Sequence, residues 1–565
     1  MKKTLLLILA FAATTFAFAA ETNDTPDNAS GLNPFAYNLS QEFNADSTEL
    51  TIRFWINALA TRVKVIFNDG VNDYILRDYN KDVPADGYKT VINTADLPHG
   101  KALTWRVEVT GAAFKYATQV GEPVKMFSPT SVDIDNNPEN DNFGTVFCIE
   151  ARPDAKDNPL YANYISYADG AGLYLLDPDG TPRPMPNQTK VRYGYNGGRV
   201  KQERQYFSGS SSCGYSPHRV RVSDDGRIFI TSLGVDGQIL WEADPWVFAN
   251  PDHPDWQTRT VKGWSKVMSV DNENTYMATE KRNCKHTYCG IYSLYEGNAE
   301  TGKFIAGPNI GFDVQGAGKD LKLLMLSGCK EAIFNCNSDH FYCSEYDLGE
   351  AKQWTTVPSR EIFRGYVVNY LGSQVQYDKN GNVWLCQYRG GTDTTTLIQF
   401  NHDGSVAYNE PKQPYRRSGA IRFNNDFTQV AIASIGSGTG GAISVYPVNA
   451  DGTISWTQGY EIDTKAVTHH SLKDFAWDYA GNLYVAADET GGKSGECIAI
   501  YAIPHAADRV VSTPAPSKLA FTLPVSTAVE DINNPTTQVE KIMQDGRIYI
   551  RTNGELFTTL GVRVQ

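Results

Sequence analysis

Short apolar runs separated by polar turns dominate this sequence. The stretch FAWDYAGNLYVAADE, at 475–489, has one apolar run before the turn from Asp478 to Gly481 and a second run after it. Two such runs joined by Asp, Asn and Gly residues predict a pair of antiparallel strands. No long segment of the sequence repeats apolar residues at the spacing of a helix. The pattern therefore predicts an all-β protein.

The strand–turn–strand unit recurs along the middle of the chain. Related stretches occupy residues 132–151, 220–232, 268–280, 326–337, 375–387 and 421–434. Successive turns lie about fifty residues apart, at Gly226, Asn274, Lys330, Gly381, Phe427 and Gly481. This period suits a four-stranded propeller blade, and each copy is followed by a further apolar run. The repeats predict a seven-bladed β-propeller over residues 125–508, with six blades as the alternative.

The residues DYAGNLYV, at 478–485, resemble the inner strands of NHL-type propellers, which are common in exported proteins. The resemblance covers roughly residues 125–508. A closed ring of blades also has a physical rationale, because one small sheet cannot bury both of its faces alone. In a ring each sheet buries its faces against its neighbours.

Both flanks of the propeller are predicted to contain further strands. Alternating apolar residues within 36–122, as in ELTIRFWI and ALTWRVEV, predict a small β-sandwich. This segment resembles the immunoglobulin-like modules that precede propellers in bacterial surface proteins. Residues 509–526 are rich in Pro, Ser and Ala, and they are predicted to be a linker. Residues 527–565 contain an Asn553-Gly554 turn between two apolar runs, which predicts a β-hairpin.

The last residues also resemble the C-terminal sorting tails of Bacteroidetes proteins that the type IX system exports. The resemblance rests on the run VEKIMQDGRIYIRTNGELFTTLGVRV, in which Phe557 stands where tyrosine is usual. It implies that the export machinery is a partner of residues 527–565. A small hairpin that caps the protein is the alternative interpretation.

The N-terminus predicts export. Lys2 and Lys3 precede an apolar run from Leu5 to Phe18. Small residues stand at Ala17 and Ala19, where a signal peptidase would cut. This is the pattern of a secretory signal peptide, which we assign to residues 1–19. No later apolar run approaches the roughly 18 residues that cross a bilayer, so no transmembrane segment is predicted. The expected location is the periplasm, the outer cell surface or the medium.

Charge and cysteine content limit the partners, cross-links and metal sites that the protein can have. The chain carries 51 Lys and Arg against 64 Asp and Glu, a formal net charge of −13, which argues against nucleic acid as a partner. In an exported protein, neighbouring cysteines predict disulfides, here Cys284 with Cys289 and Cys336 with Cys343. The run CKHTYC could instead bind a metal, but it has no obvious fourth ligand. We therefore predict no metal and no cofactor.

Ligands of propellers usually bind at the mouth of the central channel, so the residues just before each inner strand are the candidates. The basic residues at these positions are His218, Arg219, Lys266, Arg416, Arg417, His469, His470 and Lys473. Converging cations would favour an anionic ligand, and an acidic polysaccharide is the sharpest hypothesis. Alternatively, these groups pair with Asp474 and other carboxylates.

Catalysis is weakly indicated. His469 and His470 precede Asp474 and could form a general base, but no nucleophile is marked. The acidic run at 133–142 fails the calcium-loop pattern of EF-hands at Pro138 and Gly144, so we predict a strand-connecting turn. The function predicted is an exported protein that binds a glycan or a surface protein. A carbohydrate-active hydrolase or lyase and a protein interaction scaffold are the alternatives.

Overall fold

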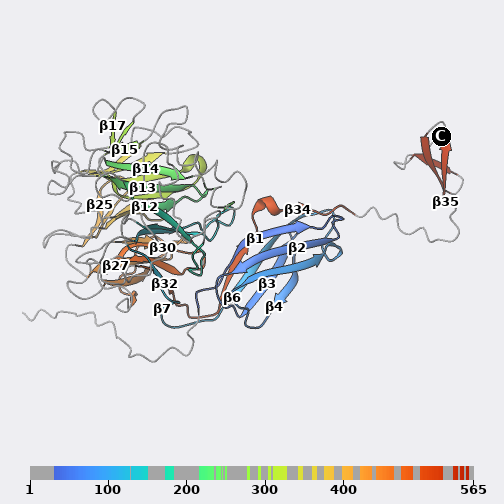
Figure 1. Ribbon diagram of the computed structural model, residues 1–565, viewed down its shortest axis with the longest axis horizontal. Helices are drawn as coiled ribbons and strands as arrows, with labels where there is room; N and C mark the ends of the chain where they lie inside the picture. The colour runs from blue at the N-terminus through green and yellow to red at the C-terminus, as the bar shows by residue number, and fades with distance from the viewer. Residues whose placement is uncertain are drawn as a thin grey trace, which may run out of the picture.

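The computed structural model describes most of the strands that the sequence predicts. The described residues are 31–127, 129–150, 172–183, 215–234, 237–243, 245, 249–250, 277–279, 291–293, 303–306, 309–327, 342–347, 359–364, 374–386, 397–410, 420–435, 441–462, 472–487, 497–525, 539–544, 547–552 and 555–558. Their elements are almost entirely β-strands in antiparallel sheets (Figure 1). The predicted all-β fold class is confirmed.

Three successive sheets have four strands each, ordered as they follow along the chain. The first contains β18 (Asn309–Gln315), β19 (Lys322–Ser327), β20 (Tyr342–Asp347) and β21 (Arg360–Arg364). The second contains β22 (Gln374–Tyr377), β23 (Val383–Cys386), β24 (Leu397–Phe400) and β25 (Val406–Glu410). The third contains β26 (Ile421–Phe423), β27 (Gln429–Ile435), β28 (Gly441–Pro447) and β29 (Tyr460–Ile462). Four consecutive antiparallel strands are the blade of a propeller.

Three more sheets begin in the same way. The first contains β9 (Pro129–Ile134), β10 (Val146–Glu150) and β11 (Gly172–Leu176). The next contains β12 (Tyr215–Val222), β13 (Ile228–Gly234), β14 (Gly237–Ala243), β15 (Met277–Thr279), β16 (Ile291–Ser293) and β17 (Lys303–Ala306). The last begins with β30 (Leu472–Trp477), β31 (Leu483–Ala487) and β32 (Cys497–Ala502).

The first strands of these six sheets surround one axis. β9 contacts β12 and β30, β12 contacts β18, β18 contacts β22, β22 contacts β26, and β26 contacts β30. The inner strands of the described part thus close a ring, which is a β-propeller-like arrangement. Of the unit predicted at 268–280, the structure describes only β15, which pairs with β14. The choice between seven and six blades stays a prediction.

The polar turns between the strands explain the repeat in the sequence. In the turn after β30, Asp478 Oδ1 accepts hydrogen bonds from the N–H groups of Ala480 (2.9 Å) and Asn482 (2.8 Å). Gly481 in this turn has a φ of 79°, a backbone conformation that favours glycine. Phe427 occupies the corresponding position after β26 with a φ of 54°. The repeated Asp and Gly therefore serve the geometry of the turn.

The outer strand of the last sheet comes from the other end of the propeller. β7 (Thr118–Gln119) and β8 (Val124–Lys125) both pair with β32. The N–H of Val120, between them, donates to the carbonyl of Ile500 at 2.9 Å. The propeller therefore begins near Thr118 rather than at 125, because this segment closes the ring.

The N-terminal module consists of two sheets over a shared core. One contains β1 (Ala36–Phe43), β2 (Glu49–Ile56) and β5 (Gly87–Asn93). The other contains β3 (Arg62–Asn68), β4 (Asp73–Tyr79) and β6 (Ala102–Gly111), and the turn η1 (Thr94–Asp96) joins β5 to β6. Phe54, Val65 and Trp105 belong to the apolar cluster between the sheets. The alternation seen in the sequence places these residues on the inner faces.

The predicted linker at 509–526 is wrong, because most of it belongs to the N-terminal module. β33 (Arg509–Pro514) pairs with β6 along its full length, and β34 (Phe521–Thr522) pairs with the start of β6. The short turn η6 (Ser517–Leu519) lies between them, and Leu523 is buried in the module core. Figure 1 shows this orange segment among the blue strands of the module. The propeller is thus inserted between β6 and β33.

The module and the propeller share an interface. An apolar cluster joins Phe35 and Val511 of the module to Phe143 and Tyr479 of two propeller turns. Asn482 adds two hydrogen bonds to the backbone of Asn33, one from Asn33 N (2.7 Å) and one to Asn33 O (3.0 Å). These contacts hold the module against the turns that follow the inner strands.

The C-terminal tail forms a sheet of its own. β35 (Val539–Gln544), β36 (Arg547–Thr552) and β37 (Glu555–Thr558) are antiparallel, so the predicted hairpin is present. Among the residues that the structure describes, no helix is long and apolar enough to cross a membrane.

One disulfide prediction fails. Cys343 in β20 is a free, fully buried thiol, and it packs in the apolar cluster that contains Leu324 and Phe363. The predicted pair of Cys284 and Cys289 lies outside the described residues.

Candidate functional site

Asp474 is the centre of a buried polar network on the propeller axis. Its side chain is fully buried, and it accepts hydrogen bonds from both terminal nitrogens of Arg221 (2.8 and 3.0 Å) and from Gln374 Nε2 (2.9 Å). The Ser131 hydroxyl donates a further hydrogen bond. Burial alone would raise the pKa of Asp474, but the Arg221 and Arg219 guanidinium groups outweigh it and hold this pKa below its ordinary value.

Arg219 belongs to this interior and not to an open mouth. Its side chain is 1% exposed, and its Nη1 donates to the carbonyls of Thr130 (2.7 Å) and Lys473 (2.9 Å). The same nitrogen lies 4.0 Å from Asp474 Oδ2, and burial lowers the pKa of Arg219 to about 10. The prediction that Arg219 faces a ligand is therefore wrong. The alternative, that it pairs with Asp474, is confirmed.

The structure describes only some of the other predicted site residues. Lys473 is the second residue of β30 and is half-buried, and its carbonyl accepts hydrogen bonds from Arg219 and Gln374 (3.2 Å). His218 lies in β12. The remaining five candidates lie outside the described residues, and they are Lys266, Arg416, Arg417, His469 and His470. The predicted basic ring at the starts of the inner strands stays a prediction.

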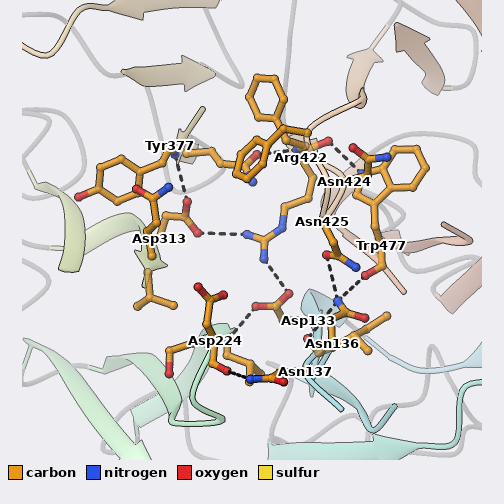
Figure 2. Close-up of a pocket in the computed structure, with 18 of the residues that line it drawn as sticks. Asp133, Asn136, Asn137, Asp224, Asp313, Tyr377, Arg422, Asn424, Asn425 and Trp477 are labelled. Carbon is orange, nitrogen blue, oxygen red and sulfur yellow. Dashed lines mark hydrogen bonds and ion pairs between the residues drawn. The ribbon is translucent and has the colours of Figure 1, made fainter. Parts of the chain in front are cut away.

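A second layer of ion pairs lies further along the axis. Arg422 donates to Asp133 Oδ1 (2.8 Å) and to Asp313 Oδ1 (3.1 Å), as Figure 2 shows. The other oxygen of each carboxylate accepts a backbone N–H from the next strand, from Val222 (2.9 Å) and Tyr377 (3.1 Å) respectively. Burial raises the pKa of Asp313, and Arg422 opposes that rise. The layer therefore ties strands from five sheets together.

A cavity of about 430 Å³ opens above this layer, at the end of the axis where the inner strands run into their turns. We call this end the turn mouth, and we call the opposite end, where the inner strands begin, the start mouth. Asp133, Asp313, Gln376 and Arg422 lie at the base of the turn mouth, and Asp224 projects its carboxylate into the cavity (Figure 2). Burial and the Asp225 charge raise the pKa of Asp224, against a backbone hydrogen bond from Gly316 that lowers it.

Amide side chains and aromatic rings complete the wall. Asn136 Nδ2 donates to Asn425 Oδ1 (3.2 Å) and to the carbonyl of Trp477 (2.8 Å). Asn137 Nδ2 donates to the carbonyl of Asp224 (2.6 Å), so these amides have fixed positions. Tyr377, Phe423, Phe427 and Trp477 also line the cavity.

The side chains that line the turn mouth include carboxylates, amides and one guanidinium group in the described part of the chain. Asp133 and Asp313 both pair with Arg422, and no histidine, cysteine or lysine lines the cavity in the described part of the chain. Within the described ranges, no three His, Cys, Asp or Glu side chains are placed to hold a metal ion. The arrangement can donate and accept hydrogen bonds and stack on an apolar ring.

Sequence reasoning missed the turn mouth because it examined the starts of the inner strands. A signal was present, since polar residues interrupt otherwise apolar inner strands. These residues are Asp133, Arg221, Asp313, Gln374, Gln376, Arg422 and Asp474. Polar groups in buried strands must find partners, so they indicate an internal network.

Comparisons with known proteins identify no family. No family model and no curated protein matches the chain. Among solved structures, a gluconolactonase from Xanthomonas campestris shares 10% identity with a TM-score of 0.33, covering 72% of this chain and 99% of that one. The hydrazine synthase of Kuenenia stuttgartiensis shares 10% identity with a TM-score of 0.34, covering 70% and 100%. Similarity at this level carries no inference about function.

Proposed function

We propose that this protein is an exported binding protein whose turn mouth binds a neutral glycan. The observation that carries the proposal is the lining of the cavity, where the exposed Asp224 carboxylate and fixed amides lie beside four aromatic side chains. Sugar hydroxyls donate to carboxylates and amides, and the apolar face of a sugar ring packs on aromatic rings. A volume of about 430 Å³ lies within the range of small-ligand sites.

The charge of the lining favours a neutral sugar over the acidic polysaccharide predicted from the sequence. Among the described residues, Asp133, Asp224 and Asp313 line the cavity with a single cation, Arg422, which already pairs with two of them. An additional carboxylate or sulfate would be repelled by Asp224. The acidic ligand was inferred from basic residues at the start mouth, where Arg219 is buried.

Export and assembly remain part of the same proposal. The signal-peptide pattern at residues 1–19 supports export, and residues 527–565 are proposed to contact the export machinery. The N-terminal module is proposed to be immunoglobulin-like, and the propeller is proposed to have seven blades, or six. A surface glycan is the proposed partner.

A binding screen of the mature protein tests the ligand. Neutral, amino, carboxylated and sulfated oligosaccharides would be titrated by calorimetry at low and moderate salt, with product analysis after long incubation. We expect saturable binding to neutral sugars that changes little with salt, because no charge pairing contributes. Release of products would instead identify a carbohydrate-active enzyme. Absence of binding to every class would favour the scaffold.

Single substitutions locate the site. Asp224→Ala removes an exposed carboxylate, and we expect it to weaken binding about tenfold. His218→Ala and Arg417→Ala alter the start mouth and should bind as the wild type does. The reverse pattern would place the ligand at the start mouth and overturn the proposal.

A further inference from the structure

The turn between β9 and β10 is the longest described turn after an inner strand, and its two ends are held together by backbone hydrogen bonds. Asp135 N donates to Thr145 O (3.2 Å), and Gly144 N donates to Asp135 O (2.8 Å). Asn140 Nδ2 donates to Asp135 Oδ1 at 2.9 Å. The turn therefore has a defined internal structure with Asp135 at its base.

Two buried oxygens in this turn lack hydrogen-bond partners. Asp135 is 1% exposed and Asn142 is 2% exposed, and no described residue donates to Asp135 Oδ2 or to Asn142 Oδ1. The orientation of the Asn142 amide is fixed, because its Nδ2 donates to the carbonyl of Pro245 at 2.7 Å. If the Asn142 amide were rotated by half a turn, its Oδ1 would face the carbonyl oxygen of Pro245, and the two oxygens would repel each other. A buried acceptor without a donor is destabilising, so an electropositive partner would stabilise both oxygens.

Both residues line a cavity of about 350 Å³ that is separate from the turn mouth. Four acidic residues line it, namely Asp135, Glu139, Asp141 and Asp225. Lys518 is the single cationic residue that the described part of the chain adds to the lining, and it already pairs with Asp141. The excess of carboxylates gives the cavity a negative potential that attracts a cation.

We propose that this cavity binds a calcium ion, with Asp135 Oδ2 and Asn142 Oδ1 as its protein ligands. Carboxylate and amide oxygens are the ligands that calcium prefers, and calcium accepts irregular shells that water completes. Water is needed here because no three acidic side chains of the described part converge on one point. With few protein ligands, the dissociation constant should be about 10⁻⁴ to 10⁻³ M, the range of extracellular calcium modules.

The position of the cavity gives the ion a structural consequence. The same turn contacts the segment after β33, where the N–H and hydroxyl of Ser517 donate to Glu139 (2.8 Å each) and Lys518 pairs with Asp141. Calcium at Asp135 and Asn142 would stiffen the turn that holds the module against the propeller. Binding should therefore slow exchange of the amide hydrogens in this turn.

Calorimetric titration of the mature full-length protein with calcium chloride, at constant ionic strength, tests the proposal. We expect one site per chain for calcium and weaker binding of magnesium, which demands a regular octahedral shell. Asp135→Asn keeps an oxygen for Asn140 but removes the charge, and it should weaken calcium binding at least tenfold. Asp403→Asn, in an exposed turn of another blade, is the matched control and should bind as the wild type does.

Hydrogen exchange of the wild type gives a readout that needs no variant. Amides of residues 135–145 should exchange more slowly in calcium than in sodium chloride of equal ionic strength. Absence of saturable binding up to 10 mM calcium, or equal affinity in Asp135→Asn and the wild type, would overturn the proposal. Unchanged exchange of these amides in saturating calcium would also overturn it.

Discussion

Arginine and aspartate side chains share the centre of the propeller. Arg219 and Arg221 surround Asp474, and Arg422 joins Asp133 to Asp313. A buried ion pair gives little net stability, because desolvation offsets the attraction. These carboxylates also accept backbone N–H groups from neighbouring strands. We therefore interpret the network as a device that fixes which inner strands lie side by side.

Asp478, in the turn after β30, predicts a pH-dependent stability. Burial raises its pKa to about 7, against the opposing effects of hydrogen bonds from Asn482 and Ala480 and the charge of Arg509. The folded state therefore binds the proton more tightly than the unfolded state. The contribution of Asp478 is fully present below about pH 4, and it is lost as the pH rises through about 7.

The measurement compares urea unfolding of the wild type and Asp478→Asn between pH 4 and 8. We expect the stability of the wild type relative to the variant to fall over this range, by about 4 kcal/mol at most. Asp403→Asn should show almost no change over this range, because hydrogen bonds from Ser405 hold the pKa of Asp403 below its ordinary value and its carboxylate is ionised in both states. A pH-independent difference for Asp478→Asn would contradict the assignment.

Individual residues show what the sequence could reveal. The turns at the repeated Asp and Gly positions could be predicted from the sequence, because turn geometry depends on residues that are close in the chain, as at Asp478 and Gly481. The burial of Arg219 could not be predicted from the sequence, because its partners Thr130 and Lys473 are far from it in the chain. Local pattern identifies a polar residue in a strand, but its partners depend on the closure of the ring.

At the scale of elements, alternation predicted the strands well where they are long. β2 and β6 alternate apolar and polar residues over eight and ten residues, and both lie within the predicted module. The segments β7, β8 and β34 contain two residues each and have no periodicity to detect. β33 was obscured by its Ser, Thr and Pro residues, and its partner β6 lies some 400 residues earlier.

Closure of the ring by β7 and β8 predicts a local opening when one hydrogen bond is removed. Val120→Pro eliminates the N–H that donates to Ile500, and it leaves a buried carbonyl without a donor at a cost of about 1–3 kcal/mol. Hydrogen exchange should show faster opening of β32, with the amides of β23 unchanged.

Val120→Ala keeps the N–H and shortens the same side chain, so it is the control for lost packing. It should leave exchange in β32 much closer to that of the wild type. Equal exchange in the proline and alanine variants would mean that this hydrogen bond does not hold the ring closed.

At the scale of the whole molecule, the N-terminal module is discontinuous in sequence. Its second sheet takes β3, β4 and β6 from before the propeller and β33 from after it. Phe521 and Leu523 also pack against the module core. The module therefore cannot be complete until the whole propeller has been synthesised.

Two truncations test this dependence. A mature chain that stops after Asp508 lacks β33 and β34, exposes the edge of β6, and should lose the cooperative unfolding of the module. A chain that stops after Val525 keeps both strands, and it should melt as the full-length protein does. Calorimetric scans of the two chains provide the comparison. Identical melting of both would show that β33 contributes nothing to the module.

The insertion of the propeller also determines how the protein would carry a mechanical load. Suppose that the C-terminal tail is attached to a surface while the turn mouth binds a ligand that is pulled away. The force then enters the folded part of the chain at Val525 and acts on β34 and β33 first. Both strands pair with β6, so the pull is resisted inside the module before it reaches β32. The module would then bear the force first, and the propeller could keep its ligand site undistorted while the C-terminal tail is under tension.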